Sequence, residues 1–291
     1  YGKLSLKNYN TLDVVFEKIK FVNKQIDFIV SGNVSSENNS INIFSSLKYI
    51  DMRYITDYLP KNFMKAKTAN YFSKAFKEGK TNNGYITING SLSSYPFYDD
   101  YSGISFAVFP IENLHMDYKT NWIPFKNING KAYFNKRGAF FISENFKVLE
   151  TNVRNPSLHI KDVKNAELSI NANLDGPLKD LITYSNKAKL SNINNKIIEK
   201  ISGKASTDFD IILAFNGNKN FYESNINLID INYDYNKSNK ILNLNGKIKF
   251  KDNNFYTERN ESLKGFYNSQ KISFKLKTDS NKNFIISGKQ K

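Results

Sequence analysis

Few residues in this sequence could carry acid–base or metal chemistry. It holds two histidines, His115 and His159, and no cysteine, which excludes disulfides, thiolate metal sites and a cysteine nucleophile. His159 lies between Leu158 and Ile160, and this alternation favours a surface histidine. Neither histidine has another at metal-ligand spacing. We therefore predict no metal site.

A pair of carboxylates stands in YPFYDDYSG, where Asp99 and Asp100 are adjacent. Adjacent side chains of a strand point to opposite faces, so a turn is favoured over a general acid–base pair. The sequence holds no serine elbow, phosphate-binding loop or dinucleotide fingerprint. We predict that the chain is not an enzyme and needs no cofactor. The single tryptophan, Trp122, is expected to pack rather than to contact a ligand.

The segment DYNKSNK resembles the start of a calcium-binding loop. Asp234, Asn236 and Ser238 would occupy its first ligand positions. The loop requires a glycine at its sixth position and a glutamate at its twelfth, where this sequence has Asn239 and Asn245. We reject a calcium site on this ground.

Composition leaves the partner of the chain open. The chain has 291 residues, a net charge of +15 and 40% hydrophobic residues, without the run of about 18 apolar residues that a transmembrane helix needs. It begins at Tyr1, so we expect a fragment of a longer protein. The charge fits nucleic acid or an anionic membrane, but the lysines spread along the polar faces of strands. We favour a solvated face and predict no nucleic acid partner.

A repeated octapeptide indicates the main structural element. NINGKAYF (127–134) and NLNGKIKF (243–250) agree at five positions. An Asn-Gly hairpin would place polar residues opposite apolar ones, whereas one continuous strand keeps the alternation. The expected strand has these residues on one face: Leu242, Leu244, Gly246, Ile248 and Phe250.

Glycines recur in phase with the apolar residues of several expected strands. Because glycine inside a strand marks a bend, a bulge or a close approach, we predict a curled sheet. The predicted bend glycines are Gly90, Gly130, Gly203, Gly246 and Gly288.

Helical periodicity occurs at two places, near 61–78, ending before Gly79, and near 177–200. The rest of residues 1–291 is expected to be one continuous, repetitive β segment without a domain boundary. Two or three short helices cannot cover the apolar face of so large a sheet. Either the sheet closes into a sandwich or barrel, or an apolar groove remains, which implies an apolar ligand.

Residues 54–215 resemble the AsmA-like superfamily of Gram-negative envelope proteins and, within it, the YhdP branch. The resemblance rests on an ordered set of segments: YLP (58–60), KAFKEGK (74–80), YPF (95–97), ISFAVFPIENLHMDY (104–118), NWIPFKNINGKAYF (121–134), LDGPLKDLI (174–182) and SGKASTDFDIILAF (202–215). One departure is that Ile123 separates Trp122 from Pro124, which the family tends to place together.

The resemblance implies an elongated, mainly β protein, whose curled antiparallel sheet forms a U-shaped apolar groove. It implies a periplasmic part of an inner-membrane-anchored protein that carries phospholipids between inner and outer membrane. Acyl chains would be the ligand, and the membranes would be reached by parts outside this chain; partner proteins stay unknown. The expected groove-lining residues are Ile88, Phe106, Val108, Ile128, Phe134, Leu168, Ile170, Phe209, Ile211, Leu213, Leu242, Leu244, Ile248 and Phe250.

Two alternatives remain open from the residues. The apolar faces could close on each other as an ordinary core. The chain could also be an envelope scaffold that assists outer-membrane protein assembly by pairing with strands and carries no lipid.

Overall fold

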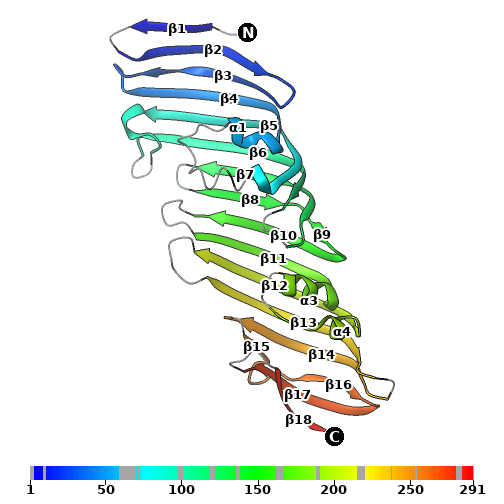
Figure 1. Ribbon diagram of the computed structural model, residues 1–291. Coiled ribbons are helices and arrows are strands. Elements are labelled where there is room, and N and C mark those ends of the chain that lie inside the picture. Colours follow the sequence, from blue (N-terminus) through cyan, green and yellow to red (C-terminus); the bar gives the residue numbers. More distant parts are fainter. Residues whose placement is uncertain are drawn as a thin grey trace. The chain divides into compact units, whose positions relative to one another are not determined.

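The computed structural model describes residues 3–8, 11–58, 70, 73–97, 101–117, 122–135, 138–161, 167–187, 191–214, 220–236, 238–252, 254–279 and 284–290 (Figure 1). Most of these residues lie in antiparallel strands, as predicted. The chain divides into two compact units. Unit 1 is Tyr1–Tyr118, Pro124–Glu144 and Leu158–Glu167, and unit 2 is Lys119–Ile123, Asn145–Ser157 and Leu168–Lys291.

In unit 1 each described strand pairs antiparallel with the next one along the chain, from β1 to β8. The strand bounds are β1 Lys3–Asn8, β2 Asp13–Val22, β3 Ile26–Ser35, β4 Ser40–Asp51, β5 Phe76–Ser91, β6 Gly103–Met116, β7 Phe125–Asn135 and β8 Ala139–Ser143. Short helices interrupt this series: η1 Met52–Tyr54, α1 Ile55–Tyr58 and η2 Leu92–Ser94.

In unit 2, β9 pairs with β10, β12 with β13, β13 with β14, β14 with β15 and β16, β16 with β17, and β17 with β18. The bounds are β9 Phe146–Val148, β10 Thr151–Ile160, β11 Glu167–Pro177, α3 Leu178–Lys187, α4 Asn195–Ile198, β12 Ile201–Ala214, β13 Phe221–Asp234, β14 Lys240–Lys251, β15 Asn254–Tyr256, β16 Leu263–Tyr267, β17 Gln270–Thr278 and β18 Phe284–Gln290.

The two helical regions of the sequence differ in outcome. Helices α3 and α4 lie within the predicted range 177–200. Most of the range 61–78 lies outside the described residues, but its predicted end is wrong, because β5 begins at Phe76, which pairs with Met116. Gly79 is therefore a strand residue rather than a helix cap. Its φ is 124°, and a Cβ there would lie 2.9 Å from the Cα of Leu114.

Bulges shift the register at matching places in the two units. Asn113 of β6 and Asp230 of β13 both have a positive φ, near 50°, and both lie where the pairing skips a residue. The amide of Asn113 donates to Asn129 Oδ1 (2.8 Å), and the amide of Asp230 donates to Asn245 Oδ1 (3.0 Å). In each case the bulge leaves a backbone amide without a partner in the β-sheet ladder, and an asparagine side chain from the next strand accepts its hydrogen bond.

These contacts explain the repeated octapeptide. Asn129 and Asn245 are the third residues of its two copies, and each precedes the glycine. A Cβ on Gly130 would lie 2.3 Å from the carbonyl oxygen of Ile142, so close strand approach requires the glycine. The first asparagine of each copy, Asn127 or Asn243, has a positive φ and forms a further bulge. The repeat therefore encodes a pair of bulges, which increases local twist.

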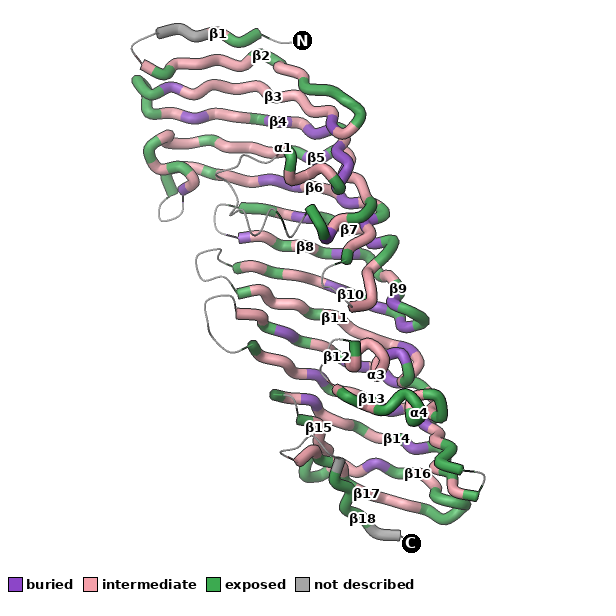
Figure 2. Tube along the Cα trace, viewed as in Figure 1, coloured by how far each residue is buried: buried purple, intermediate pink, exposed green. Residues whose placement is uncertain are grey.

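Burial alternates along the strands (Figure 2). In unit 1, Ile26, Leu47 and Ile50 form a buried cluster that Ile55 and Tyr58 of α1 cover in part. In unit 2 a second cluster comprises Ala205, Leu228, Ile231, Leu244 and Leu263. Leu178 and Leu181 of α3 pack on this second cluster, so each unit has a small core under a helix.

Hydrogen bonds between Asp51 and Arg53 stabilise the turn that leads into α1. The Asp51 carboxylate caps η1 by accepting from the Arg53 amide (3.0 Å), and it also accepts from Arg53 Nε (3.0 Å) and Nη2 (2.5 Å). The hydrogen bond from the Arg53 side chain is the main cause that lowers the pKa of Asp51, against the effect of burial. The Asp51 charge is thus stabilised in the folded chain.

Candidate functional site

The apolar face of unit 2, here the Leu244 face, crosses β12, β13 and β14. Its rows follow from the register: Ala205–Leu228–Gly246, Thr207–Ile226–Ile248 and Phe209–Ser224–Phe250. Ile211 and Leu213 continue the face along β12. On β11, the side-chain amides of Asn171 and Asn173 donate to aspartates on the opposite face of β12. Leu168 and Ile170 alternate with these asparagines, so Leu168 and Ile170 lie on the Leu244 face.

The predicted lining residues on this face differ in their exposure. Leu244, Ile211 and Phe250 are buried, and Leu244 belongs to the core under α3. Half-buried side chains remain in reach of a ligand: Leu168, Ile170, Phe209, Leu213 and Ile248. The Leu244 face is therefore part core and part accessible apolar surface.

Two hydroxyls interrupt the Leu244 face. Thr207 and Ser224 are both buried, and their hydroxyl groups hydrogen-bond to each other. A buried hydroxyl without a partner would repel an apolar ligand. Because these two satisfy each other, the face stays compatible with an apolar contact.

The apolar face of unit 1, here the Ile88 face, holds three of the predicted residues. Ile88 pairs with Ile43 and Ser105, Phe134 pairs with Ala107, and Ile128 is buried at 4% exposure. Phe134 is 43% exposed and contacts the ring of Phe109. The face is thus open at Phe134 and closed at Ile128.

The structure places Phe106 and Val108 on the opposite face of unit 1, so the prediction that they line one face with Ile88 is wrong. Phe106 pairs with Thr87 and Asn135, and Val108 pairs with Tyr85 and Tyr133. Strand β6 carries apolar side chains on both faces, so its pattern alone does not fix the phase.

Sequence reasoning missed the second apolar surface of unit 1, here the Phe106 face. Phe44 (53% exposed), Tyr85 (40%) and Phe140 (36%) share this side with Phe106 and Tyr133. Tyr85 contacts Phe106, and Phe140 contacts Tyr133. The sequence did indicate this surface, because aromatic residues occupy positions of β4, β5 and β8 that the alternation assigned to the polar face.

Leu242 is also misplaced by the alternation. Ile231 pairs with Leu244 and Tyr233 pairs with Ile241, so β14 uses one residue more than β13 between these pairs. That extra residue brings Ile241, not Leu242, to the Leu244 face, where Ile241 packs on the core. Leu242 is 37% exposed on the other side. The phase slips at the bulge residue Asn243 rather than at Gly246.

The five in-phase glycines have different roles. Gly203 lies at a register shift with a φ of 105°, and Gly130 and Gly246 adjoin bulges. The register runs without a shift through Gly90 and Gly288, so neither glycine lies at a bulge. A Cβ on Gly90 would lie 2.9 Å from the Phe97 ring, whose 1% exposure shows that it fills this space.

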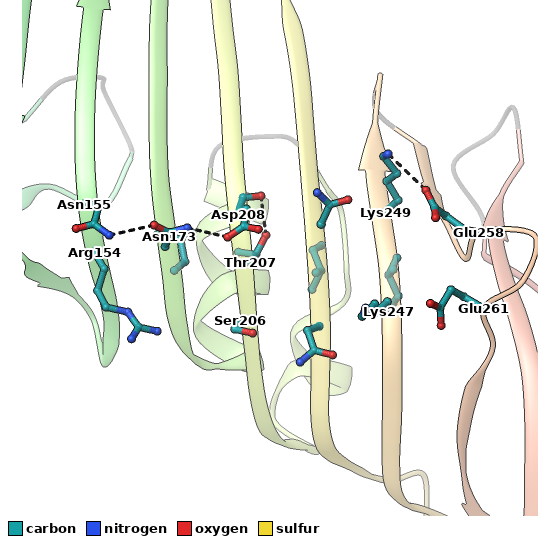
Figure 3. A pocket seen from close by; sticks show the side chains of 15 residues that line it. Arg154, Asn155, Asn173, Ser206, Thr207, Asp208, Lys247, Lys249, Glu258 and Glu261 are labelled. Atoms are coloured by element: carbon teal, nitrogen blue, oxygen red, sulfur yellow. Dashed lines mark hydrogen bonds and ion pairs between the residues drawn. The ribbon is translucent and has the colours of Figure 1, made fainter.

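The opposite side of unit 2, here the Asp208 face, is polar and hollowed (Figure 3). A cavity of about 690 Å³ spans β10 to β14, and the loop with Glu258 and Glu261 borders it. Asn173 Nδ2 donates to Asp208 Oδ1 at 2.7 Å, and Asn155 donates to Asn173 at 3.4 Å. The amide and carboxylate groups thus form a ladder across neighbouring strands.

Ion pairs continue this ladder on β14. Lys249 Nζ lies 3.0 Å from Glu223 and 3.4 Å from Glu258, and Lys251 lies 3.6 Å from Glu223. The hydrogen bond from Lys249 lowers the pKa of Glu223, and the same bond raises the pKa of Lys249. Lys249 and Glu223 are partly buried, with side chains 23% and 24% exposed, whereas Glu258 is exposed. The Lys249–Glu258 pair therefore contributes little to stability.

The residues that the sequence singled out for possible chemistry make ring contacts or form a turn. The exposed His159 contacts the Phe140 ring edge-on, and the Trp122 ring contacts Tyr184 of α3. Asn236 Oδ1 accepts from the Ser238 and Asn239 amides, which makes a turn. Asp99 and Asp100 lie outside the described residues.

Within the described ranges, no group of three or more His, Asp or Glu side chains could hold a metal ion. In the same ranges, no helix has the length and apolar character to cross a membrane.

Comparison with known proteins gives one match. A protein-family model described as YhdP protein matches residues 2–291, nearly the whole chain and more than the resembling segment 54–215. No curated protein and no solved structure matches the chain.

Proposed function

The chain belongs to the YhdP family, and from this premise we propose that it is a segment of a bridge-like lipid-transfer protein. Its apolar sheet faces contact phospholipid acyl chains while the headgroups stay in water. The segment works in the periplasm and supports lipid movement between inner and outer membrane.

The partly exposed apolar surface of the sheet carries this proposal. Phe134 is 43% exposed on the Ile88 face, and Ile88, Leu213 and Ile248 are half-buried. Each methylene group of an acyl chain that such a surface removes from water contributes about 0.8 kcal/mol. Contacts of this kind need no catalytic residue and few directional bonds, so a lipid can slide along the face.

The decisive measurement is the phospholipid content of the chain purified without detergent, determined by mass spectrometry of extracted lipid. Lipid in stoichiometric amount supports the proposal. A stable, lipid-free chain contradicts it, because the apolar faces would then close as an ordinary core. The strand-pairing scaffold would in that case be the better explanation.

Two neighbouring residues offer a matched pair of variants. Leu213 lies on the Leu244 face and Ile212 on the Asp208 face of the same strand. We expect Leu213→Lys to lower bound phospholipid severalfold, because a buried charge opposes an apolar ligand, and Ile212→Lys to leave it unchanged. Equal lipid content in the two variants would contradict the assignment of the face.

Leu244 does not serve this test. Its side chain is 8% exposed and packs in the core cluster of unit 2. The strand alternation predicts Leu244 to be a lining residue, but a lysine in this position would be buried without a partner. We therefore expect Leu244→Lys to unfold unit 2, which circular dichroism would show, rather than to block lipid alone.

A further inference from the structure

Exposed lysines gather on one side of the strands β14, β16 and β17. Lys264 alternates with the buried Leu263, and the lysines of β17 alternate with Phe274 and Leu276, which pack on the core. They therefore point away from the Leu244 face. We name this surface the lysine face; its exposed members are Lys247, Lys264, Lys271, Lys275 and Lys277.

Two carboxylates on this side neutralise other lysines, whereas Asp208 and Asp210 of β12 accept hydrogen bonds from asparagines. Glu223 and Glu258 pair with Lys249 and Lys251. Among the described residues, the members of the lysine face form no ion pair, although Lys275 donates a hydrogen bond to the Arg259 carbonyl. Glu261, half-buried beside the cavity of Figure 3, is a further carboxylate there. The lysine face thus keeps a net positive charge.

Apolar side chains interleave with these lysines. Leu242 pairs with Phe266, which pairs with Lys271, and Tyr256 stands between Lys249 and Lys277 in the register. Leu242, which the bulge at Asn243 turns to this side, is 37% exposed. Aromatic and apolar residues between lysines are typical of surfaces at a membrane–water interface.

We propose that the lysine face binds the surface of a bilayer rich in anionic phospholipids. Lysine is a flexible, strongly hydrated point charge, and its three donors suit dispersed phosphates rather than one fixed anion. The lysines spread over three strands and do not converge on one point, which fits a charged plane. Within unit 2 this contact is on the opposite side of the strands from the Leu244 face, and it does not depend on the acyl-chain contact.

Vesicle co-sedimentation of the whole chain tests this proposal. One vesicle preparation contains phosphatidylcholine alone, and the other contains about 30% phosphatidylglycerol, each at about 0.05 M and about 0.3 M salt. We expect binding to the anionic vesicles at low salt, weaker binding at high salt, and none to neutral vesicles. Binding that ignores lipid charge or salt would overturn the proposal.

A combined variant, Lys264→Gln with Lys271→Gln and Lys277→Gln, tests the location. Each lysine near an anionic bilayer contributes about fivefold in affinity, so the variant should bind about 100-fold more weakly at low salt. The control changes three exposed lysines of unit 1 (Lys48→Gln, Lys126→Gln and Lys131→Gln) and removes the same charge. Equal losses in the two variants would overturn the assigned surface.

Two further readouts separate the rival explanations. A single-stranded oligonucleotide that binds more tightly than the anionic vesicles, and is lost in the same variant, would assign the face to nucleic acid instead. The lipid content of the detergent-free protein should be unchanged in the lysine variant, and Leu213→Lys should still bind vesicles. These two results distinguish a failure of the bilayer contact on the lysine face from a failure of the acyl-chain contact in the proposed function.

Discussion

The bulge of β13 supplies the sharpest test of why the octapeptide is repeated. Asn245 makes three hydrogen bonds there: its Oδ1 accepts from the Asp230 amide (3.0 Å), and its Nδ2 donates to Asp230 Oδ1 (3.1 Å) and to the Asn243 carbonyl (2.9 Å). Each such bond contributes about 0.5–1.5 kcal/mol net, and exposed ones lie at the lower end. Asn245→Ala should therefore lower the free energy of unfolding by about 1–2.5 kcal/mol.

The control for this change is Asn227→Ala. Asn227 is exposed on the same strand as Asp230, and no side-chain hydrogen bond joins it to another described residue. The same substitution there should alter the free energy of unfolding by less than about 0.5 kcal/mol. Urea titration followed by far-ultraviolet circular dichroism measures both values.

Hydrogen exchange gives a local check on the same prediction. The Asp230 amide should exchange faster in Asn245→Ala than in the unaltered chain, because its acceptor is gone. If the two variants unfold at the same urea concentration and the Asp230 amide exchanges at an unchanged rate, the asparagine does not hold the bulge. The repeat would then need another explanation.

Three other outcomes follow from the fold. Gly203→Ala should lower the free energy of unfolding by about 1–3 kcal/mol, since φ is 105° and the new Cβ would lie 2.4 Å from the Asp230 carbonyl oxygen; thermal unfolding measures this, and an unchanged midpoint would refute it. Leu263→Ala should cost about 2–5 kcal/mol, because its side chain is 1% exposed; a loss below about 1 kcal/mol in urea titration would mean that the site is not packed. Asp51 has a lowered pKa in the folded state, so its contribution is full above the unfolded value near 3.9 and disappears as the pH falls through the folded pKa. The stability difference between the unaltered chain and Asp51→Asn should hence shrink below about pH 4, and a constant difference would contradict the role of Arg53.

Alternation of apolar and polar residues was sufficient to predict the strands, and it failed where a bulge or a two-sided strand intervenes. Leu242 lies on the other face than predicted because the bulge at Asn243 adds one residue to β14. A pattern of apolar and polar residues does not reveal a residue with a positive φ. Phe106 could not be placed because β6 is apolar on both sides, so only pairing with β5 and β7 fixes its phase.

The accessible apolar surface was harder to predict than the strands. Leu244 and Leu213 are both apolar and in phase, yet α3 packs over the cluster that contains Leu244, while Leu213 lies outside that cluster. Which strand positions a short helix covers depends on where it docks, and the docking is tertiary. The Phe106 face was missed because the prediction assumed one polar side for every strand.

The contact between Trp122 and Tyr184 gives the chain an internal optical reporter. Trp122 is the single tryptophan, and its ring centroid lies 5.8 Å from that of Tyr184 on α3. Emission excited selectively at this indole therefore comes from one place, beside the helix that packs over the core of unit 2. A helix displaced from the sheet would alter the surroundings of the indole, so its fluorescence reports such a displacement in real time without a label.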